Sequence, residues 1–227
     1  MSTTYGITIS MDQNTVDSLS GAGYCLFAFK AVQGPTIGVP LVWLKTSNYA
    51  MSTPVSWQEL YQAYSSTSPI LNGAMIEVGN SYAVDLGDRF TISSSSGAGS
   101  VTTDGSSPTG VDIYNMTTTQ FACGISQQNS SGTCNPMSAF LLYGQMQDTI
   151  APVEQVMLMF SIAPVNTGGV MIKSDSQCVM IDLSTQSSRA VIYKINFGWD
   201  TSSQSGMKIY PPNTDLSALL IQPYSYP

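Results

Sequence analysis

The chain has 227 residues, of which seven are Lys or Arg, 14 are Asp or Glu and none is His. Charged residues make up 9% of the chain, against about 25% in an average soluble domain. The lack of histidine excludes Ser-His-Asp and Cys-His catalysis and imidazole-ligated metals. We therefore expect no catalytic residue, no metal site and no cofactor. A formal net charge of −7 with only two arginines argues against nucleic acid as a partner.

Apolar and polar residues alternate along much of the chain. At the N-terminus, Tyr5, Ile7, Ile9 and Met11 alternate with small polar residues, as in a half-buried strand. Breaks rich in Gly, Pro, Asn and Ser separate the strands at short intervals, which predicts an all-β antiparallel sandwich of jelly-roll, lectin or toxin type. Further strands are expected at residues 24–32, 39–44, 82–86, 90–92, 111–116, 121–125, 139–143, 153–162, 170–173, 178–183, 191–197 and 216–221.

No internal repeat of 20 to 50 residues and no clean linker interrupts this pattern. Residues 1–227 are therefore predicted to form one sandwich domain. The segment Met1–Gly6 has neither a basic start nor an apolar run, so no signal peptide is expected. The run Val156–Phe160 is far too short to span a bilayer as a helix. These features predict a protein that is cytoplasmic as synthesised, with release by lysis or an unconventional route left open.

One short helix is predicted near residues 57–64. The segment Ser56–Glu59 matches a capping box, in which a serine hydroxyl and a glutamate carboxylate satisfy amide groups at a helix start. Val55 and Leu60 occupy the positions of a hydrophobic staple, and Leu60, Tyr61 and Tyr64 would share one helical face.

The segment Ser93–Gly110 has the lowest complexity, because 15 of its 18 residues are Ser, Thr, Gly or Pro. It is predicted to form a long exposed loop or a hairpin tip. Cys123 and Cys134 flank another polar loop that a disulfide would close, and the sequence leaves open whether that disulfide forms. Cys25 and Cys178 lie in apolar runs and are predicted to be buried.

Carboxylates offer the remaining route to catalysis. Asp85, Asp88 and Asp112 lie near predicted turns, and a carboxylate-dependent hydrolase would need two of them facing each other in a cleft. Asp residues in turns more commonly bond their own backbone. We therefore predict that the protein is not an enzyme and keep the hydrolase as a lesser alternative.

Aromatic residues beside a carboxylate give the candidate binding site. Trp199 and Asp200 follow a predicted strand, and Tyr224 and Tyr226 lie in the C-terminal tail. Tyr and Trp are suited to a sugar face, a lipid interface or a protein contact. These four residues are the predicted ligand-binding residues, with a glycan or a membrane lipid as the ligand.

The scarcity of charge also predicts self-association. Exposed strands usually carry charges that prevent edge-to-edge pairing, whereas the polar faces here are mostly Ser, Thr, Asn and Gln. The sequence thus predicts a lectin-like or toxin-like binding protein that acts as a homo-oligomer. The alternative is a structural or inclusion protein that assembles into crystals or filaments.

Overall fold

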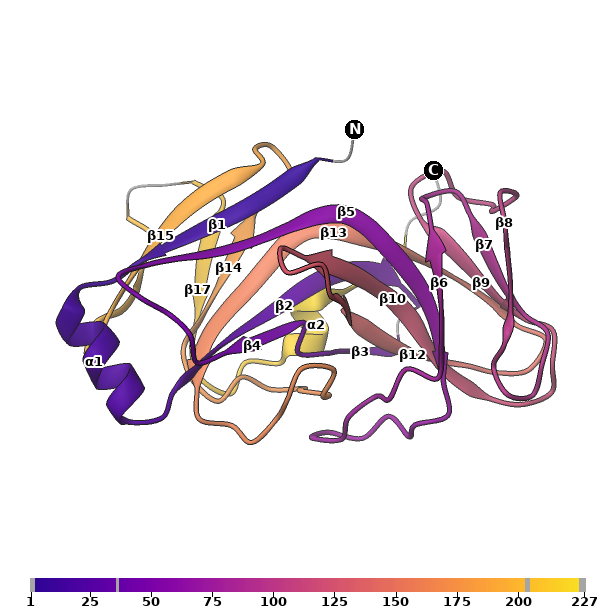
Figure 1. The fold of residues 1–227 in the computed structure, drawn as a ribbon, viewed down its shortest axis with the longest axis horizontal. Helices are drawn as coiled ribbons and strands as arrows, with labels where there is room; N and C mark the ends of the chain where they lie inside the picture. Colours follow the sequence, from indigo (N-terminus) through magenta and orange to yellow (C-terminus); the bar gives the residue numbers. More distant parts are fainter. Residues whose placement is uncertain (1–2, 36, 203–204, 225–227) are drawn as a thin grey trace.

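The computed structural model describes residues 3–35, 37–202 and 205–224. Strands account for 53% of the chain and helices for 6%, so the all-β prediction is confirmed. The strands form two curled, mixed sheets (Figure 1). Among the described residues, no helix is long and apolar enough to cross a membrane.

The first sheet contains nine strands. Along its main path the strands are β16 (Gly198–Asp200), β15 (Ser188–Lys194), β1 (Thr4–Ser10), β5 (Ser52–Ser66), β10 (Phe121–Asn129), β12 (Ser138–Leu142) and β3 (Gly38–Pro40). Beside this path, β6 (Asn80–Val84) pairs with β5 and β11 (Cys134–Pro136) pairs with β10.

The second sheet also contains nine strands. Its main path is β17 (Met207–Tyr210), β14 (Cys178–Asp182), β13 (Gln147–Ser161), β9 (Val111–Asn115), β7 (Arg89–Ile92) and β8 (Gly99–Thr102). On the other side of β13 lies β2 (Cys25–Gly34), which also pairs with β4 (Leu44–Thr46) and β18 (Ile221–Pro223).

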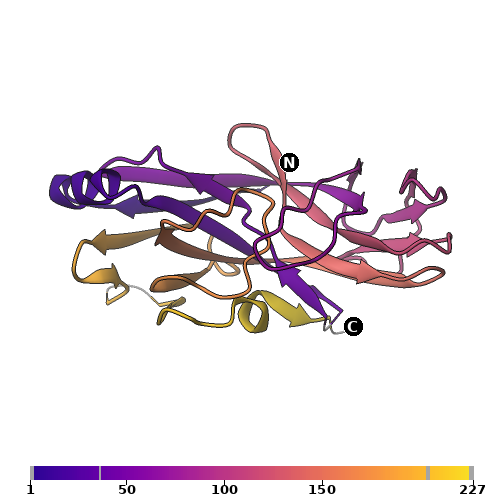
Figure 2. The same cartoon turned by 90° about the horizontal axis from the view of Figure 1, so that it is seen from below.

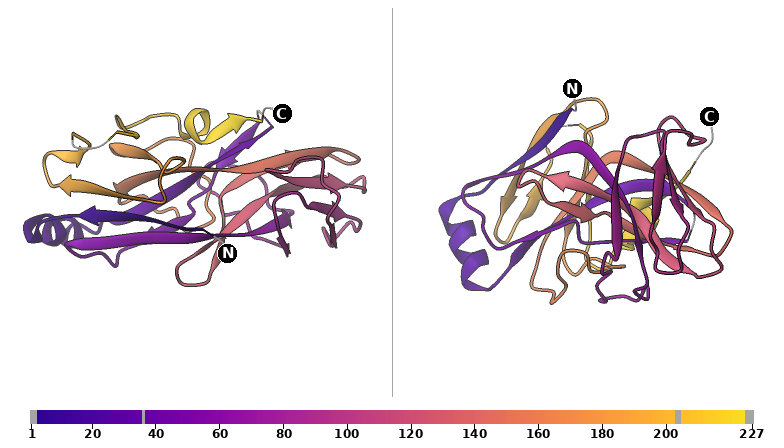
Figure 3. Two further views of the ribbon diagram at one scale, coloured as in Figure 1. Left: turned by 90° about the horizontal axis from the view of Figure 1, so that it is seen from above. Right: turned by 45° about the vertical axis from the view of Figure 1, so that its right-hand side comes forward.

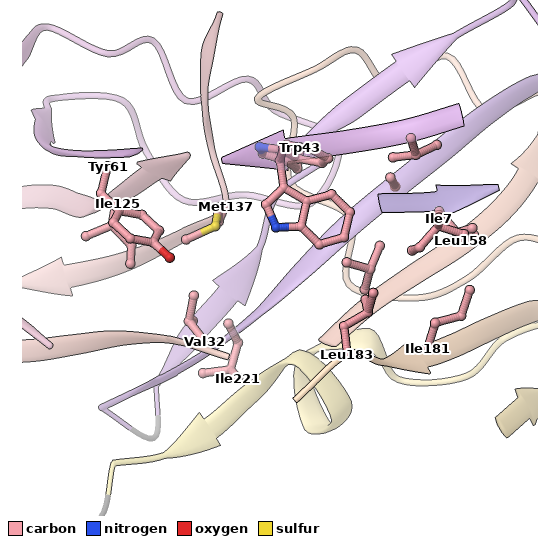
Figure 4. Close-up of a cluster of buried hydrophobic side chains, with 14 of the residues drawn as sticks. Ile7, Val32, Trp43, Tyr61, Ile125, Met137, Leu158, Ile181, Leu183 and Ile221 are labelled. Carbon is pink, nitrogen blue, oxygen red and sulfur yellow. The ribbon is translucent and has the colours of Figure 1, made fainter. Parts of the chain in front are cut away.

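The two sheets lie in two layers, seen from below in Figure 2 and from above in Figure 3. Their facing side chains form one large apolar cluster, which joins Ile7 and Trp57 of the first sheet to Leu158 and Ile181 of the second. Figure 4 shows part of this cluster around the indole of Trp43. The sequence pattern identified inward-facing residues such as Ile7 and Ile9 of β1, but it did not identify Trp57, which it placed in a helix.

Strand direction was only partly predicted, because both sheets are mixed rather than antiparallel. Strands β1 and β15, β7 and β9, and β2 and β18 pair in parallel. Alternation of apolar residues tells which face of a strand is buried but not which way its neighbour runs. Parallel neighbours come from distant parts of the chain, as with β1 and β15, so no local turn signal marks them.

The helix predicted near residues 57–64 is wrong, because this segment lies inside the 15-residue strand β5. Thr53, Val55, Trp57, Tyr61 and Ala63 are buried while most of the residues between them are more exposed, which is the period of a strand. The Glu59 carboxylate of the apparent capping box accepts hydrogen bonds from Thr3 N and Tyr5 Oη instead. Long-range pairing with β1 and β10 therefore overrides the local helix signal.

The structure has two short helices that the sequence analysis missed. Helix α1 (Gln13–Gly21) begins at Asp12, whose carboxylate accepts a hydrogen bond of 2.7 Å from Thr15 N. Helix α2 (Leu216–Leu220) occupies most of a segment predicted as a strand, and its N-cap is Asp215. Both caps are the short acidic residues preferred at helix starts.

The low-complexity segment Ser93–Gly110 contains strand β8, which pairs with β7 as a hairpin. The hairpin alternative of the prediction is therefore confirmed for residues 93–98, which form the tip between β7 and β8, and the residues between β8 and β9 form a loop.

All four cysteines are free. Cys134 pairs with Gln128 of β10, whereas Cys123 lies further back in β10 and pairs with Phe140 of β12. The disulfide between them that the sequence left open is thus not formed.

Candidate functional site

The turn between β15 and β16 presents the most exposed large hydrophobic side chain among the described residues, that of Phe197, which is 84% exposed. Asn196 and Gly198, on either side of it, both have a positive φ. The Phe197 amide donates a hydrogen bond of 3.1 Å to Lys194 O. This tight turn points a large ring outward, and the sequence analysis overlooked it.

Trp199, predicted as an exposed binding residue, is only 4% exposed. Its indole stacks on Phe160 at a centroid distance of 5.6 Å and meets Tyr193 edge-on at 4.9 Å. The side-chain oxygen of Gln177 accepts from Trp199 N at 3.0 Å, and Gln177 O accepts from Trp199 Nε1 at 3.2 Å. The indole therefore packs beneath the turn, on its buried side, and does not present an exposed aromatic face.

Helix α1 holds the other side of the same turn. The buried Thr15 hydroxyl accepts a hydrogen bond of 3.0 Å from Ile195 N. The turn is thus fixed at three points, through Thr15, Gln177 and its own Lys194 carbonyl. A fixed turn keeps the Phe197 ring exposed, and it loses little conformational freedom when a ligand binds.

Asp200, predicted as a ligand-binding residue, is exposed beside this turn. Its Oδ1 accepts hydrogen bonds from Ser202 N at 3.0 Å and Ser202 Oγ at 2.6 Å. These bonds, with a smaller contribution from the Lys194 ammonium, lower the pKa of Asp200 below its usual value. The carboxylate is therefore ionised at neutral pH, and within the described part of the chain its Oδ2 accepts no hydrogen bond.

These residues surround a surface depression of about 390 Å³. Its lining residues are Lys194, Phe197, Gly198, Trp199, Asp200, Thr201, Ser202 and Ile209. The structure thus places two of the four predicted ligand-binding residues in one pocket and adds an exposed ring to them. We call this group the Phe197 turn.

The predicted tail residues lie elsewhere. Tyr224 contacts its own chain, because its hydroxyl hydrogen-bonds Ser107 Oγ and its amide donates to Gly34 O at 3.1 Å. Tyr226 lies outside the described residues. The structure does not bring Tyr224 together with Trp199 and Asp200. A ligand-binding role of the tail stays a prediction.

A second polar group, absent from the sequence analysis, surrounds Lys30 at the centre of the molecule. Lys30 is fully buried, and its Nζ lies 3.4 Å from Glu154 Oε2 and 3.6 Å from the ring centre of Trp57. Trp57 Nε1 donates to the same carboxylate at 3.2 Å. This group joins the two sheets, since Trp57 belongs to β5 and both charged residues belong to the second sheet.

Strand irregularities explain how a carboxylate reaches this interior position. The register between β13 and β2 shifts between Val153 and Val156, so Glu154 lies in a β-bulge, a feature that re-aims a side chain. Burial lowers the pKa of Lys30 from its usual 10.5 to about 8, although Glu154 opposes this shift. Because no part of Lys30 is exposed, it serves packing and not the capture of an external ligand.

The carboxylates considered for hydrolysis have structural contacts. Asp112 is fully buried and accepts hydrogen bonds from Ser106 N at 2.6 Å and Thr149 Oγ1 at 2.7 Å. Asp88 Oδ2 accepts from Asp85 N at 2.8 Å, which closes a turn. Among residues 3–35, 37–202 and 205–224, no group of three or more Cys, Asp or Glu side chains is arranged to hold a metal ion.

Comparisons of the chain with protein-family models, with curated proteins and with solved structures find no match.

Proposed function

We propose that the protein is a non-enzymatic, lectin-like sandwich that binds a sugar at the Phe197 turn and acts as a homo-oligomer. The observation that supports this function is an almost fully exposed phenylalanine, 84% accessible, on a turn fixed by buried partners. Exposing such a ring is unfavourable in water. A ligand that covers it would recover this free energy.

The chemistry around the ring favours a sugar over a purely apolar ligand. The phenyl face offers an apolar platform for the C–H groups of a pyranose. Asp200 Oδ2 can accept hydrogen bonds from hydroxyl groups, and the Lys194 ammonium offers a donor at the same depression. A pocket with an apolar surface and few polar groups is the usual form of a small-ligand site.

A glycan array probed with the purified protein tests this proposal. We expect binding to a limited set of glycans and at least a tenfold loss of affinity in Phe197→Ala. Ile37→Ala is the matched control, because Ile37 is 82% exposed but is not part of the Phe197 turn. This control should bind as the unmodified protein does.

Two results would overturn the proposal. The first is an array without any bound glycan at micromolar protein. The second is equal glycan binding by Phe197→Ala and the unmodified protein. Circular dichroism of each variant separates a lost contact from a lost fold.

Self-association is the second part of the proposal and would raise the avidity of a weak site. Edge strand β8 (Gly99–Thr102) carries no charged residue, and such an edge is not protected against pairing with another copy. Light scattering at micromolar concentration and pH 7 should show an assembly larger than a monomer. A monomer that persists towards pH 5 would contradict it, while assembly without any glycan binding would favour the structural or inclusion alternative.

A further inference from the structure

Strand β9 lies at the end of the molecule away from α1 (Figure 1). One buried asparagine at the end of this strand organises two neighbouring loops. Asn115 is fully buried at the end of β9. Its Nδ2 donates to Thr119 O at 2.7 Å and to Tyr143 O at 3.2 Å, and its Oδ1 accepts from Thr117 N at 3.0 Å. Its backbone amide donates to Met146 O at 3.0 Å. The loops 116–120 and 143–146 are therefore held together.

These two loops expose three large side chains. Met116 is 56% exposed, Tyr143 is 59% exposed and Met146 is 55% exposed. The loops that carry them are joined directly by a hydrogen bond of 3.1 Å from Gln145 N to Thr117 O. We call this group the neutral tip. Its apolar side chains are presented by an ordered scaffold, as expected of a contact surface.

The neutral tip lies in the longest uncharged part of the chain. No Asp, Glu, Lys or Arg occurs in residues 113–147, a run of 35 residues in a protein with net charge −7. The hydrogen-bonding groups on both loops are the backbone, the Thr and Gln side chains and the Tyr143 hydroxyl, and none of them carries a formal charge. A partner recognised through charge is therefore poorly suited to this surface, whereas a neutral one is well suited.

The size of the tip favours a bilayer over another protein. Three half-exposed side chains of this size offer at most a few hundred Å², whereas a stable protein interface takes roughly 800 Å² from each partner. A lipid interface needs no matching partner surface, and Tyr is enriched at the level of the headgroups. An anionic bilayer would repel the net negative charge of the protein.

We propose that the neutral tip inserts Met116, Tyr143 and Met146 into the interfacial region of a zwitterionic lipid bilayer. This lipid contact is separate from the sugar contact at the Phe197 turn. Strand β13 runs between the two regions, because Met146 precedes its first residue and Phe160, near its last, stacks on Trp199. Each contact can therefore fail without the other.

Flotation with phosphatidylcholine vesicles tests this inference. We expect the protein to float with the vesicles, with little change between low and physiological salt. The triple variant Met116→Ser, Tyr143→Ser and Met146→Ser should lose at least tenfold in the bound fraction. Ile162→Ser is the matched control, because Ile162 is 66% exposed and directly follows the other end of β13. This control should float as the unmodified protein does.

Three results would overturn the inference. One is no flotation with phosphatidylcholine, and another is flotation only with phosphatidylserine vesicles. The third is an oligomer, seen by light scattering without lipid, that dissociates in the triple variant. This result would show that a second copy of the chain, and not a bilayer, covers the neutral tip. Unchanged circular dichroism and an unchanged unfolding midpoint must accompany each variant.

Discussion

The Phe197 turn and the neutral tip are built in the same way but differ in their charges. Each presents an exposed apolar side chain on a turn or loop that buried residues hold in place, Thr15 at one end and Asn115 at the other. The Phe197 turn combines its ring with Lys194 and Asp200. The tip lies in a run of 35 residues without a formal charge.

This difference shows that exposure alone does not identify a ligand. An exposed ring beside a carboxylate and an ammonium suits a ligand with both apolar faces and hydroxyl groups. Exposed Met and Tyr side chains in neutral surroundings suit a zwitterionic bilayer, which has an apolar interior and no net charge at its surface. The charges that surround each exposed side chain therefore distinguish the two contacts that we propose.

The largest effect is expected from Asn115→Ala, which tests the scaffold of the neutral tip. The change removes four side-chain hydrogen bonds of a fully buried residue. With about 1 kcal/mol for each bond, the free energy of unfolding should fall by about 3–4 kcal/mol. Urea denaturation followed by circular dichroism measures this change. A loss below about 1 kcal/mol would show that the two loops are held by other contacts.

The pH dependence of stability tests the Lys30 group, which lies between the two regions and joins the sheets. The pKa of Lys30 is about 8 in the folded protein and 10.5 when unperturbed, so between these values the unfolded chain binds more protons. The free energy of unfolding should therefore rise from pH 8 towards pH 10, by at most about 1.4 kcal/mol per pH unit. Lys30→Met should remove this rise, whereas Lys45→Met should keep it.

At higher pH the tyrosines reverse the trend. Burial and the nearby carboxylates raise the pKa of Tyr5 from 10.0 to about 12, so above pH 10 the unfolded chain loses its proton first. Stability should then fall between pH 10 and 12. A free energy of unfolding that falls steadily from pH 8 upward would show that burial does not lower the pKa of Lys30.

A smaller effect is expected from Gln177→Ala at the Phe197 turn. The change removes one hydrogen bond, from Trp199 N to the Gln177 side chain, while the backbone carbonyl still accepts from the indole. The free energy of unfolding should fall by about 1 kcal/mol. Urea denaturation of Gln177→Ala and Asn115→Ala under the same conditions compares the two scaffolds directly. Equal losses in the free energy of unfolding would contradict the prediction that Asn115 contributes more stability than Gln177.

Much of the fold could be predicted from the sequence because burial leaves a local pattern. The alternation from Tyr5 to Met11 and the apolar run 24–32 predicted strands close to the observed β1 and β2. The same reasoning failed for β5, because Ser56 and Glu59 imitate a helix start. Only the pairing of β5 with β1 and β10 decides its structure, and this pairing is not local.

The candidate site could be predicted only in part. The sequence analysis named Trp199 and Asp200 because an aromatic residue beside a carboxylate is visible in the sequence, and their role in binding stays a prediction. The exposed Phe197 was missed, although Asn196 and Gly198 around it are residues that tolerate a positive φ. The Lys30 group had no local signal, since Glu154 and Trp57 reach Lys30 from β13 and β5.

The most direct test of two separate contacts is a competition measurement on the unmodified protein. The 14 residue-to-residue steps from Met146 to Phe160 span up to about 45 Å as extended strand, so a sugar at the Phe197 turn should not reach the neutral tip. Phosphatidylcholine flotation is measured with and without a saturating amount of the soluble sugar that binds best on the array. An unchanged bound fraction is the expected result, and displacement of the protein from the vesicles by the sugar would contradict the account.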